Sequence, residues 1–182
     1  LATASGTVVL TGNASGTDQN SGAPVSSDYA SSSQITIQSP AALSVNIWAV
    51  PALTATAKTG QLITVYMAVT NTGGAAANTV LPSALVLSAP IASVNTAPSA
   101  GVNIPGGGSA YFTWTYNADA PGLVDFQGIA SGLDANTGLA VASVPDTSNS
   151  VQIADSAFLR NDISVSRLVV SSGQQITVVL SV

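Results

Sequence analysis

Two copies of one short motif are the residues whose types and spacing best suggest a specific chemistry. Asp18-x-Asn20-x-Gly22 and Asp134-x-Asn136-x-Gly138 each place side-chain oxygens two residues apart, followed by a glycine. Calcium loops use this alternation of oxygen ligands and this turn-forming glycine. The chain has no glutamate to act as the bidentate ligand that usually follows, and Asp, Asn and Gly also suit a tight hairpin. Each copy therefore predicts either a calcium site, with Asp18 and Asn20 or Asp134 and Asn136 as ligands, or a hairpin turn; no other cofactor is expected.

Catalytic chemistry finds little support in the composition. The 182 residues include no cysteine and no histidine, so thiolate nucleophiles, imidazole bases and the commonest ligands of transition metals are missing. Serines are abundant, but a serine nucleophile needs an adjacent base. The aspartates stand next to turn residues, where Asx turns explain them. We expect no catalytic residues and no enzyme activity.

Two surface features could bind or carry sugars. Asn13-Ala14-Ser15 is a glycosylation sequon. Asn13 is predicted to point outward because the alternating residues Val8, Leu10, Gly12 and Ala14 are predicted to point inward. Aromatic side chains could form a platform for stacking sugars. The candidates for this platform are Trp48, Trp114, Tyr66, Tyr111 and Tyr116. Trp114 and Tyr116 are better explained as core residues, which leaves Tyr66 and Tyr111 as the outward pair.

The charge balance excludes two classes of partner. Three basic and eight acidic residues give a net charge of -5, which cannot neutralise a run of phosphates. We therefore expect neither nucleic acid nor anionic membranes as partners, and no apolar run reaches the roughly 18 residues of a membrane span. A surface of Ser, Thr, Asn and Gly is typical of exported repeat proteins. The composition predicts an extracellular or cell-surface location.

An internal repeat carries most of the information. With a shift of 116 residues, Gly6 to Ile37 aligns with Gly122 to Ile153, and thirteen of the 32 positions are identical. With a shift of 113 residues, Gly60 to Val69 aligns with Gly173 to Val182. The repeat unit is therefore about 115 residues. We predict the last strands of one repeat in residues 1–40, a complete repeat in residues 41–158 and the first strands of another in residues 159–182.

The hydrophobic pattern predicts strands throughout. Ile63, Val65, Met67 and Val69 alternate with polar or small residues, as half-buried strands require. About seven strands are expected in the complete repeat, at 41–50, 62–69, 85–87, 111–116, 124–130, 139–141 and 151–153. Turn signals separate them and no amphipathic helix intervenes. The predicted fold is an all-β, immunoglobulin-like β-sandwich, with one complete copy flanked by two partial copies.

Two stretches of the complete repeat carry a family resemblance. Val69-Thr70-Asn71-Thr72-Gly73-Gly74-Ala75-Ala76 and Gly107-Gly108-Ser109-Ala110-Tyr111-Phe112-Thr113-Trp114 give the motifs V-T-N-T-G-x-A-A and G-G-S-x-x-F-x-W. These resemble the cell-adhesion-related (CARDB-like) repeats of bacterial and archaeal surface proteins. The resemblance implies an immunoglobulin-like architecture and a surface location. It carries over no catalytic residue.

The partial repeats suggest how the protein works. The strands containing Ile176, Val178, Leu180 and Val182 could complete the half-sandwich around Val8 and Leu10 of the next molecule. We therefore predict a structural or adhesive surface protein that forms filaments head to tail. Neighbouring repeats of one longer chain could complete the partial copies instead, if the sequence is a fragment. The alternative function is a carbohydrate-binding accessory domain of a secreted enzyme, whose partner would be a surface glycan.

Overall fold

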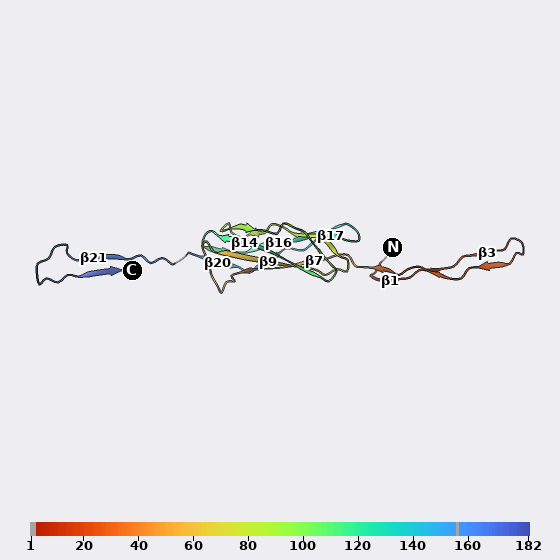
Figure 1. Ribbon diagram of the computed structural model, residues 1–182, viewed down its shortest axis with the longest axis horizontal. Helices are drawn as coiled ribbons and strands as arrows, with labels where there is room; N and C mark the ends of the chain where they lie inside the picture. The colour runs from red at the N-terminus through yellow and green to blue at the C-terminus, as the bar shows by residue number, and fades with distance from the viewer. Residues whose placement is uncertain (1–2, 156) are drawn as a thin grey trace.

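The computed structural model describes residues 3–155 and 157–182 and is elongated (Figure 1). A central sandwich, residues 39–155, carries a narrow arm at each end. The N-terminal arm comprises residues 3–38 and the C-terminal arm residues 157–182. The described residues form strands, turns and loops without a helix, so the predicted all-β sandwich is confirmed.

One layer of the sandwich is a four-stranded antiparallel sheet. Its strands follow the order β12-β14-β9-β7. Their bounds are β7 Leu43–Val50, β9 Leu62–Asn71, β12 Ala92–Thr96 and β14 Ser109–Ala118. Strand β9 lies between β7 and β14 over nearly its whole length, so β7 forms one edge of the sheet.

The other layer is built around one long hairpin. Its outgoing half contains β15 Gly122–Val124, β16 Phe126–Gly128 and β17 Ala130–Asp134, and its returning half β18 Ala140–Ala142, β19 Asp146–Thr147 and β20 Val151–Ala154. We refer to residues 122–154 as the closing hairpin. Shorter strands flank it: β8 Ala57–Lys58, β10 Ala77–Pro82, β11 Val86–Leu87 and β13 Val102–Ile104. Strand β8 runs parallel to β20, whereas the other pairs are antiparallel.

The core lies between the two layers and follows the predicted alternation. Ile63, Val65, Met67 and Val69 of β9 are fully buried, as are Val124 and Phe126 of the closing hairpin. On β14 the inward residues are Phe112, Trp114 and Tyr116, and burial raises the pKa of the Tyr116 phenol. The inward placement predicted for Trp114 and Tyr116 is therefore confirmed. The tilted contact of Tyr116 with Phe126, at 4.8 Å between ring centroids, joins the two layers.

Both arms are hairpins with largely exposed side chains. The N-terminal arm pairs β1 with β6, β2 with β5 and β3 with β4. These strands are β1 Gly6–Val8, β2 Thr11–Gly12, β3 Ser15–Thr17, β4 Pro24–Ser26, β5 Ala30–Ser31 and β6 Ile35–Ile37. The C-terminal arm pairs β21, Asp162–Val165, with β22, Val178–Ser181.

Some strands differ from the prediction. The single strand expected at 124–130 is interrupted at Asp125 and Ile129. At these interruptions the hydroxyls of Ser148 and Ser143 accept hydrogen bonds from the N–H groups of Phe126 and Ala130, at 3.1 and 3.0 Å. Strands β8, β10, β12, β13 and β19 lie outside the seven ranges expected from the hydrophobic pattern.

No helix among the described residues is long and apolar enough to cross a membrane.

Candidate functional site

The turn of the closing hairpin is held by one carboxylate. Oδ1 of Asp134 accepts hydrogen bonds from the N–H of Asn136 at 2.9 Å, from the N–H of Thr137 at 2.8 Å and from the Thr137 hydroxyl at 3.0 Å. Gly138 completes the turn with a φ of 71°, a conformation that glycine adopts without a steric penalty. The D-x-N-x-G motif thus forms a hairpin turn.

The second oxygen of Asp134 joins this hairpin to the beginning of the sandwich. Oδ2 accepts a hydrogen bond from the N–H of Ala41, at 2.7 Å, and both residues are buried. This bond is the main reason that the pKa of Asp134 lies below its usual range, and the bonds from Thr137 add to it. The carboxylate therefore fixes both the turn and the position of the segment that leads into β7.

Two further side chains of the closing hairpin cap the free edge of β7. Oδ2 of Asp146 accepts from the N–H of Ile47 at 2.7 Å, and Oδ1 of Asn149 accepts from the N–H of Ala49 at 2.9 Å. Unpaired N–H groups on an edge strand invite another chain to pair with them. With Asp134, these side chains replace the missing neighbouring strand. We call Asp134, Asp146 and Asn149 the three caps.

The N-terminal arm reproduces the closing hairpin residue for residue. Gly6 pairs with Ile37 as Gly122 pairs with Ile153, and Ser15 pairs with Ser26 as Ser131 pairs with Ala142. Each pair of positions differs by the shift of 116 that the sequence indicated. The serine bonds recur as well, because Ser32 and Ser27 accept from the N–H groups of Leu10 and Ala14.

Asp18 occupies the place of Asp134 in the arm. Its Oδ1 accepts from the N–H of Asn20, the N–H of Ser21 and the hydroxyl of Ser21, at 3.0, 2.7 and 2.8 Å. The bonds from Ser21 lower the pKa of Asp18. The N–H of Ala41 donates to Oδ2 of Asp134, but among the described residues no equivalent N–H donates to Oδ2 of Asp18. The other two caps are replaced, by Ala30 and Ser33.

The C-terminal arm reproduces the pair β7 and β9. Ile163 pairs with Leu180 and Val165 with Val178, as Ile47 pairs with Met67 and Ala49 with Val65. The following turns also match. The N–H of Ser171 donates to Oε1 of Gln174 at 3.0 Å, and the N–H of Lys58 donates to Oε1 of Gln61 at 3.1 Å. Equivalent residues of the arm and the sandwich thus differ by 116 positions in β21 and by 113 from the turn onward. The three-residue difference therefore lies in the connector between β21 and this turn.

Two of the glycines common to the arm and the closing hairpin have different surroundings. A Cβ on Gly128 would lie 2.6 Å from Cδ2 of Leu85 and 3.0 Å from Cε of Met67, so a side chain at this position would displace the ends of both side chains. A Cβ on its counterpart Gly12 would meet nothing within 4 Å. Similarly, Gly132 faces the backbone of β10, whereas only Val25 of its own arm approaches Gly16. The N-terminal arm thus has the same two glycines without the crowding that surrounds their counterparts.

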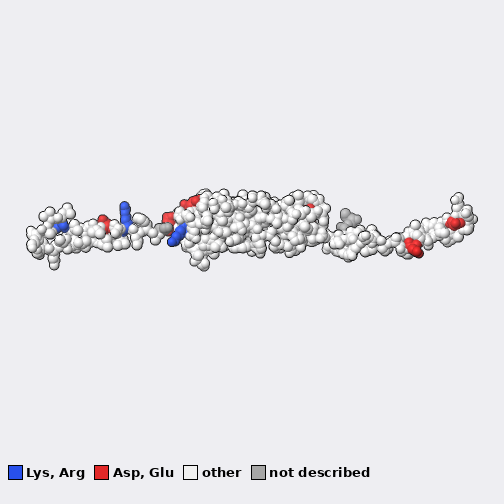
Figure 2. Space-filling model, in the orientation of Figure 1, with Lys and Arg blue, Asp and Glu red and all other residues white. Residues whose placement is uncertain are grey.

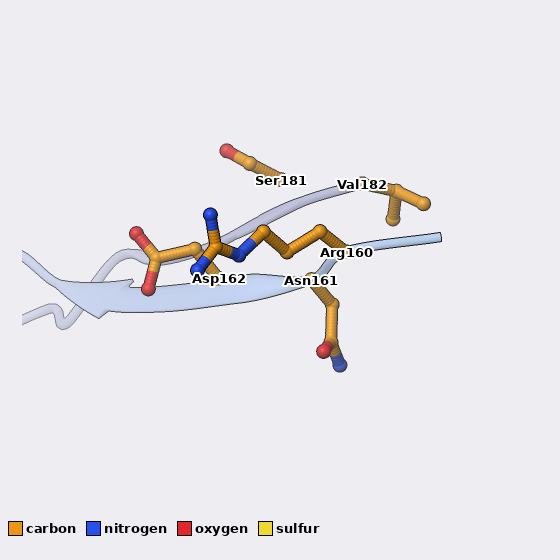
Figure 3. A pocket seen from close by; sticks show the side chains of 5 residues that line it. All are labelled: Arg160, Asn161, Asp162, Ser181 and Val182. Carbon is orange, nitrogen blue, oxygen red and sulfur yellow. The ribbon is translucent and has the colours of Figure 1, made fainter. Parts of the chain in front are cut away.

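The predicted assembly residues lie in the arms with open apolar faces. Exposure is 52% for Ile176, 62% for Val178, 58% for Leu180 and 60% for Leu10, whereas Val8 is half-buried. Val182 is 79% exposed, although its counterpart Val69 is fully buried. Val182 lines an open hollow at the base of the C-terminal arm, together with Arg160, Asn161, Asp162 and Ser181 (Figure 3). This hollow marks an unpacked part of the arm.

An aromatic cluster lies on the outer face of the four-stranded sheet. Trp48 of β7 stacks on Tyr66 of β9, with ring centroids 5.4 Å apart and an interplanar angle of 19°. Tyr111 of β14 meets Trp48 edge-on at 6.4 Å and is 70% exposed. Of the five platform candidates, the structure therefore brings three together and buries Trp114 and Tyr116 in the core.

The remaining candidate residues are polar and near the surface. Asn13 is exposed, but nearly every side chain of its arm is exposed, so exposure does not test glycosylation. Asn136 donates from Nδ2 to Oε1 of Gln38 at 3.0 Å, which ties the sandwich to the base of the N-terminal arm. Within residues 3–155 and 157–182, no three acidic, histidine or cysteine side chains gather in the manner of a metal site. Charged side chains are sparse over the whole visible surface (Figure 2).

No protein-family model matches the chain, and no curated protein is significantly similar to it. The resemblance to CARDB-like repeats accordingly stays a prediction that rests on the two motifs.

The lowered pKa of Asp134 predicts an acid-sensitive sandwich. A carboxyl whose pKa is lower in the folded than in the unfolded state stabilises the fold above its ordinary titration range, and this contribution is lost as pH falls below about 5. Asp134→Asn should lower the Tm at pH 7 and make it depend less on pH between about 5 and 3. Differential scanning calorimetry across this range measures both effects. Asp28→Asn, an equal charge change on the N-terminal arm, should leave the Tm unchanged; equal effects of the two variants would contradict this role of Asp134.

The calcium interpretation can be tested in the same way. Since Oδ1 of both Asp18 and Asp134 already accepts three hydrogen bonds, we expect calcium up to about 5 mM to leave the Tm unchanged. A rise in Tm with calcium concentration, absent with magnesium, would show that the motif binds calcium after all.

Proposed function

We propose that this chain is a structural module of an extracellular or cell-surface filament, which assembles head to tail by completing half-built sandwiches. One observation carries the proposal: the two arms copy the two complementary halves of a contact that the central sandwich contains. The N-terminal arm copies the closing hairpin, and the C-terminal arm copies the pair β7 and β9 that packs against it.

The energetics favour pairing of the arms. Burying a Val, Leu or Ile side chain contributes about 1.5–3 kcal/mol, so four such residues contribute about 6–12 kcal/mol, which is comparable with a cost of association of roughly 4–15 kcal/mol. The C-terminal arm offers Ile163, Val165, Val178 and Leu180, and the N-terminal arm adds Leu10 and Ile35. Neither arm contains counterparts of β10 to β14. A two-arm junction is therefore smaller than the complete sandwich and should form reversibly.

The surface composition agrees with a mechanical or spatial role outside the cell. With few charges and no cysteine, association depends on apolar packing and hydrogen bonds, which are less sensitive to salt and redox conditions than ion pairs or disulfides. An adhesive role would use the sides of such a filament, since the ends of the sandwich are occupied by the arms.

Self-assembly predicts a face-specific effect of charge in the C-terminal arm. Leu180→Asp, at the counterpart of buried Met67, should abolish assembly, because it would bury an unpaired carboxylate. Val179→Asp, at the counterpart of Tyr66 on the outer face, should preserve assembly. Deleting residues 176–182 should also abolish assembly and leave the Tm of the sandwich unchanged. Sedimentation velocity and electron microscopy measure assembly; fibres that survive the deletion would refute the proposal.

A second candidate function, carbohydrate binding, is favoured by the aromatic cluster of Trp48, Tyr66 and Tyr111. The ring of Tyr111 is free to stack on a sugar, whereas Trp48 is stacked on Tyr66. The equivalent positions in the C-terminal arm are Ser164 and Val179, so the pairing of these strands does not itself require aromatic residues.

Binding to glycans would depend mainly on Tyr111. If this candidate function holds, the chain should co-sediment with an insoluble polysaccharide such as cellulose or chitin, and Tyr111→Ala should weaken binding about tenfold, as expected for the loss of one stacked ring. Tyr29→Ala, which removes an exposed tyrosine from the N-terminal arm, is the control. Equal retention of the two variants would eliminate the cluster as a sugar platform.

A further inference from the structure

The central sandwich contains a template for the contact between two molecules. Three segments from the beginning of the repeat contact its closing hairpin. The N–H of Ala41 donates to Asp134, the edge of β7 donates to the other two caps, and β8 pairs with β20. The N-terminal arm presents the same hairpin without these segments. The C-terminal arm presents the same segments without the hairpin.

We propose that the C-terminal arm of a second copy of this chain docks on the N-terminal arm in the register of the central sandwich. This inference rests on the proposed self-assembly and specifies its contacts. In that register the N–H of Ala157 donates to Oδ2 of Asp18, and Val170 and Ser171 run parallel to the end of β6, beside Ile37 and Gln38.

Asp18 is the polar anchor of this contact. Of the three caps, the arm retains only the aspartate at the turn, since Ala30 and Ser33 replace the other two. Oδ1 of Asp18 accepts hydrogen bonds from its own turn, as Oδ1 of Asp134 does. In the sandwich, the other oxygen, Oδ2 of Asp134, accepts the hydrogen bond from Ala41. A charge-assisted bond of this kind is geometrically specific, so it fixes the register of the junction rather than only strengthening it.

Gly12 is the apolar counterpart of this anchor. In the sandwich, the side chain of Met67 ends against Gly128, 3.0 Å from where a Cβ would lie. The residue equivalent to Met67 in the C-terminal arm is Leu180, and the residue equivalent to Gly128 is Gly12. The isolated arm gives Gly12 no neighbour within 4 Å of a built Cβ, so its own packing does not require glycine. Docked Leu180 does.

The chain has no cysteine, so disulfides introduced in pairs report the register directly. Lys58 and Ala154 are direct partners across β8 and β20, which makes Lys58→Cys with Ala154→Cys the intramolecular standard. We expect full-length chains carrying Ser171→Cys to form covalent heterodimers with chains carrying Gln38→Cys. Ser171→Cys with Ser26→Cys is the control, because Ser26 corresponds to Ala142, which pairs in the hairpin away from β8.

The polar anchor is tested by Asp18→Asn. Asparagine can keep the turn through its Oδ1, but it presents an amide donor in place of Oδ2, and we expect the Kd of association to rise at least about tenfold. Asp28→Asn makes the same charge change on the same arm, at the counterpart of exposed Val144, and should leave the Kd unchanged. Neither variant should alter the Tm of the central sandwich.

The outcomes separate this inference from the proposed function. Selective cross-linking of positions 38 and 171, together with a larger effect of Asp18→Asn than of Asp28→Asn, supports the register. Assembly that cross-links equally at positions 26 and 38, or that responds equally to the two substitutions, overturns the register and leaves self-assembly standing. A chain that stays monomeric at every concentration in sedimentation overturns both.

Discussion

The hydrogen bond from the N–H of Ala41 to Asp134 is the contact on which closure of the sandwich depends. The two residues are separated by 93 positions, and the bond joins the entry to the first strand with the tip of the last hairpin. The same carboxylate holds the turn, so the local shape of the hairpin and the long-range closure of the fold share one group. Because the donor and the acceptor are both buried, losing either partner would leave the other unpaired away from water.

Much of the fold followed from periodicity, and the rest followed from contacts that periodicity does not encode. The alternation in Ile63 to Val69 predicted β9 because that strand is buried on one face along its length. Strand β10 was missed because it contains a proline, a residue with positive φ at Thr79 and a shift in register, which together obscure the alternation. Strands β12 and β13 were missed because most of their residues are exposed, so little in their sequence distinguishes them from loops.

The position of the candidate site and its hairpin turn were predictable, but its long-range partner was not. The repeated D-x-N-x-G motif located Asp18 and Asp134, and the repeat identified which residues in the arms are equivalent to residues of the sandwich. The partner of Asp134 is a backbone N–H, which no side-chain pattern reveals. Likewise, the outward position of Trp48 depends on the pairing of β7 with β9, which places it opposite Tyr66. Glycines 12 and 16 acquired a meaning only when their open surroundings could be compared with those of Gly128 and Gly132.

The serines at the interruptions of the hairpins have a kinetic consequence. In the N-terminal arm, Ser27 and Ser32 accept from the N–H groups of Ala14 and Leu10 and donate to the carbonyls of Asp28 and Ser33, all within one hairpin. The arm thereby holds its shape through contacts within residues 6–37, which require no second molecule. In the assembly proposed above, little conformational entropy would then remain to be lost at the encounter. The rate of joining would be set by diffusion and orientation of two prebuilt surfaces, and not by folding of one chain upon another.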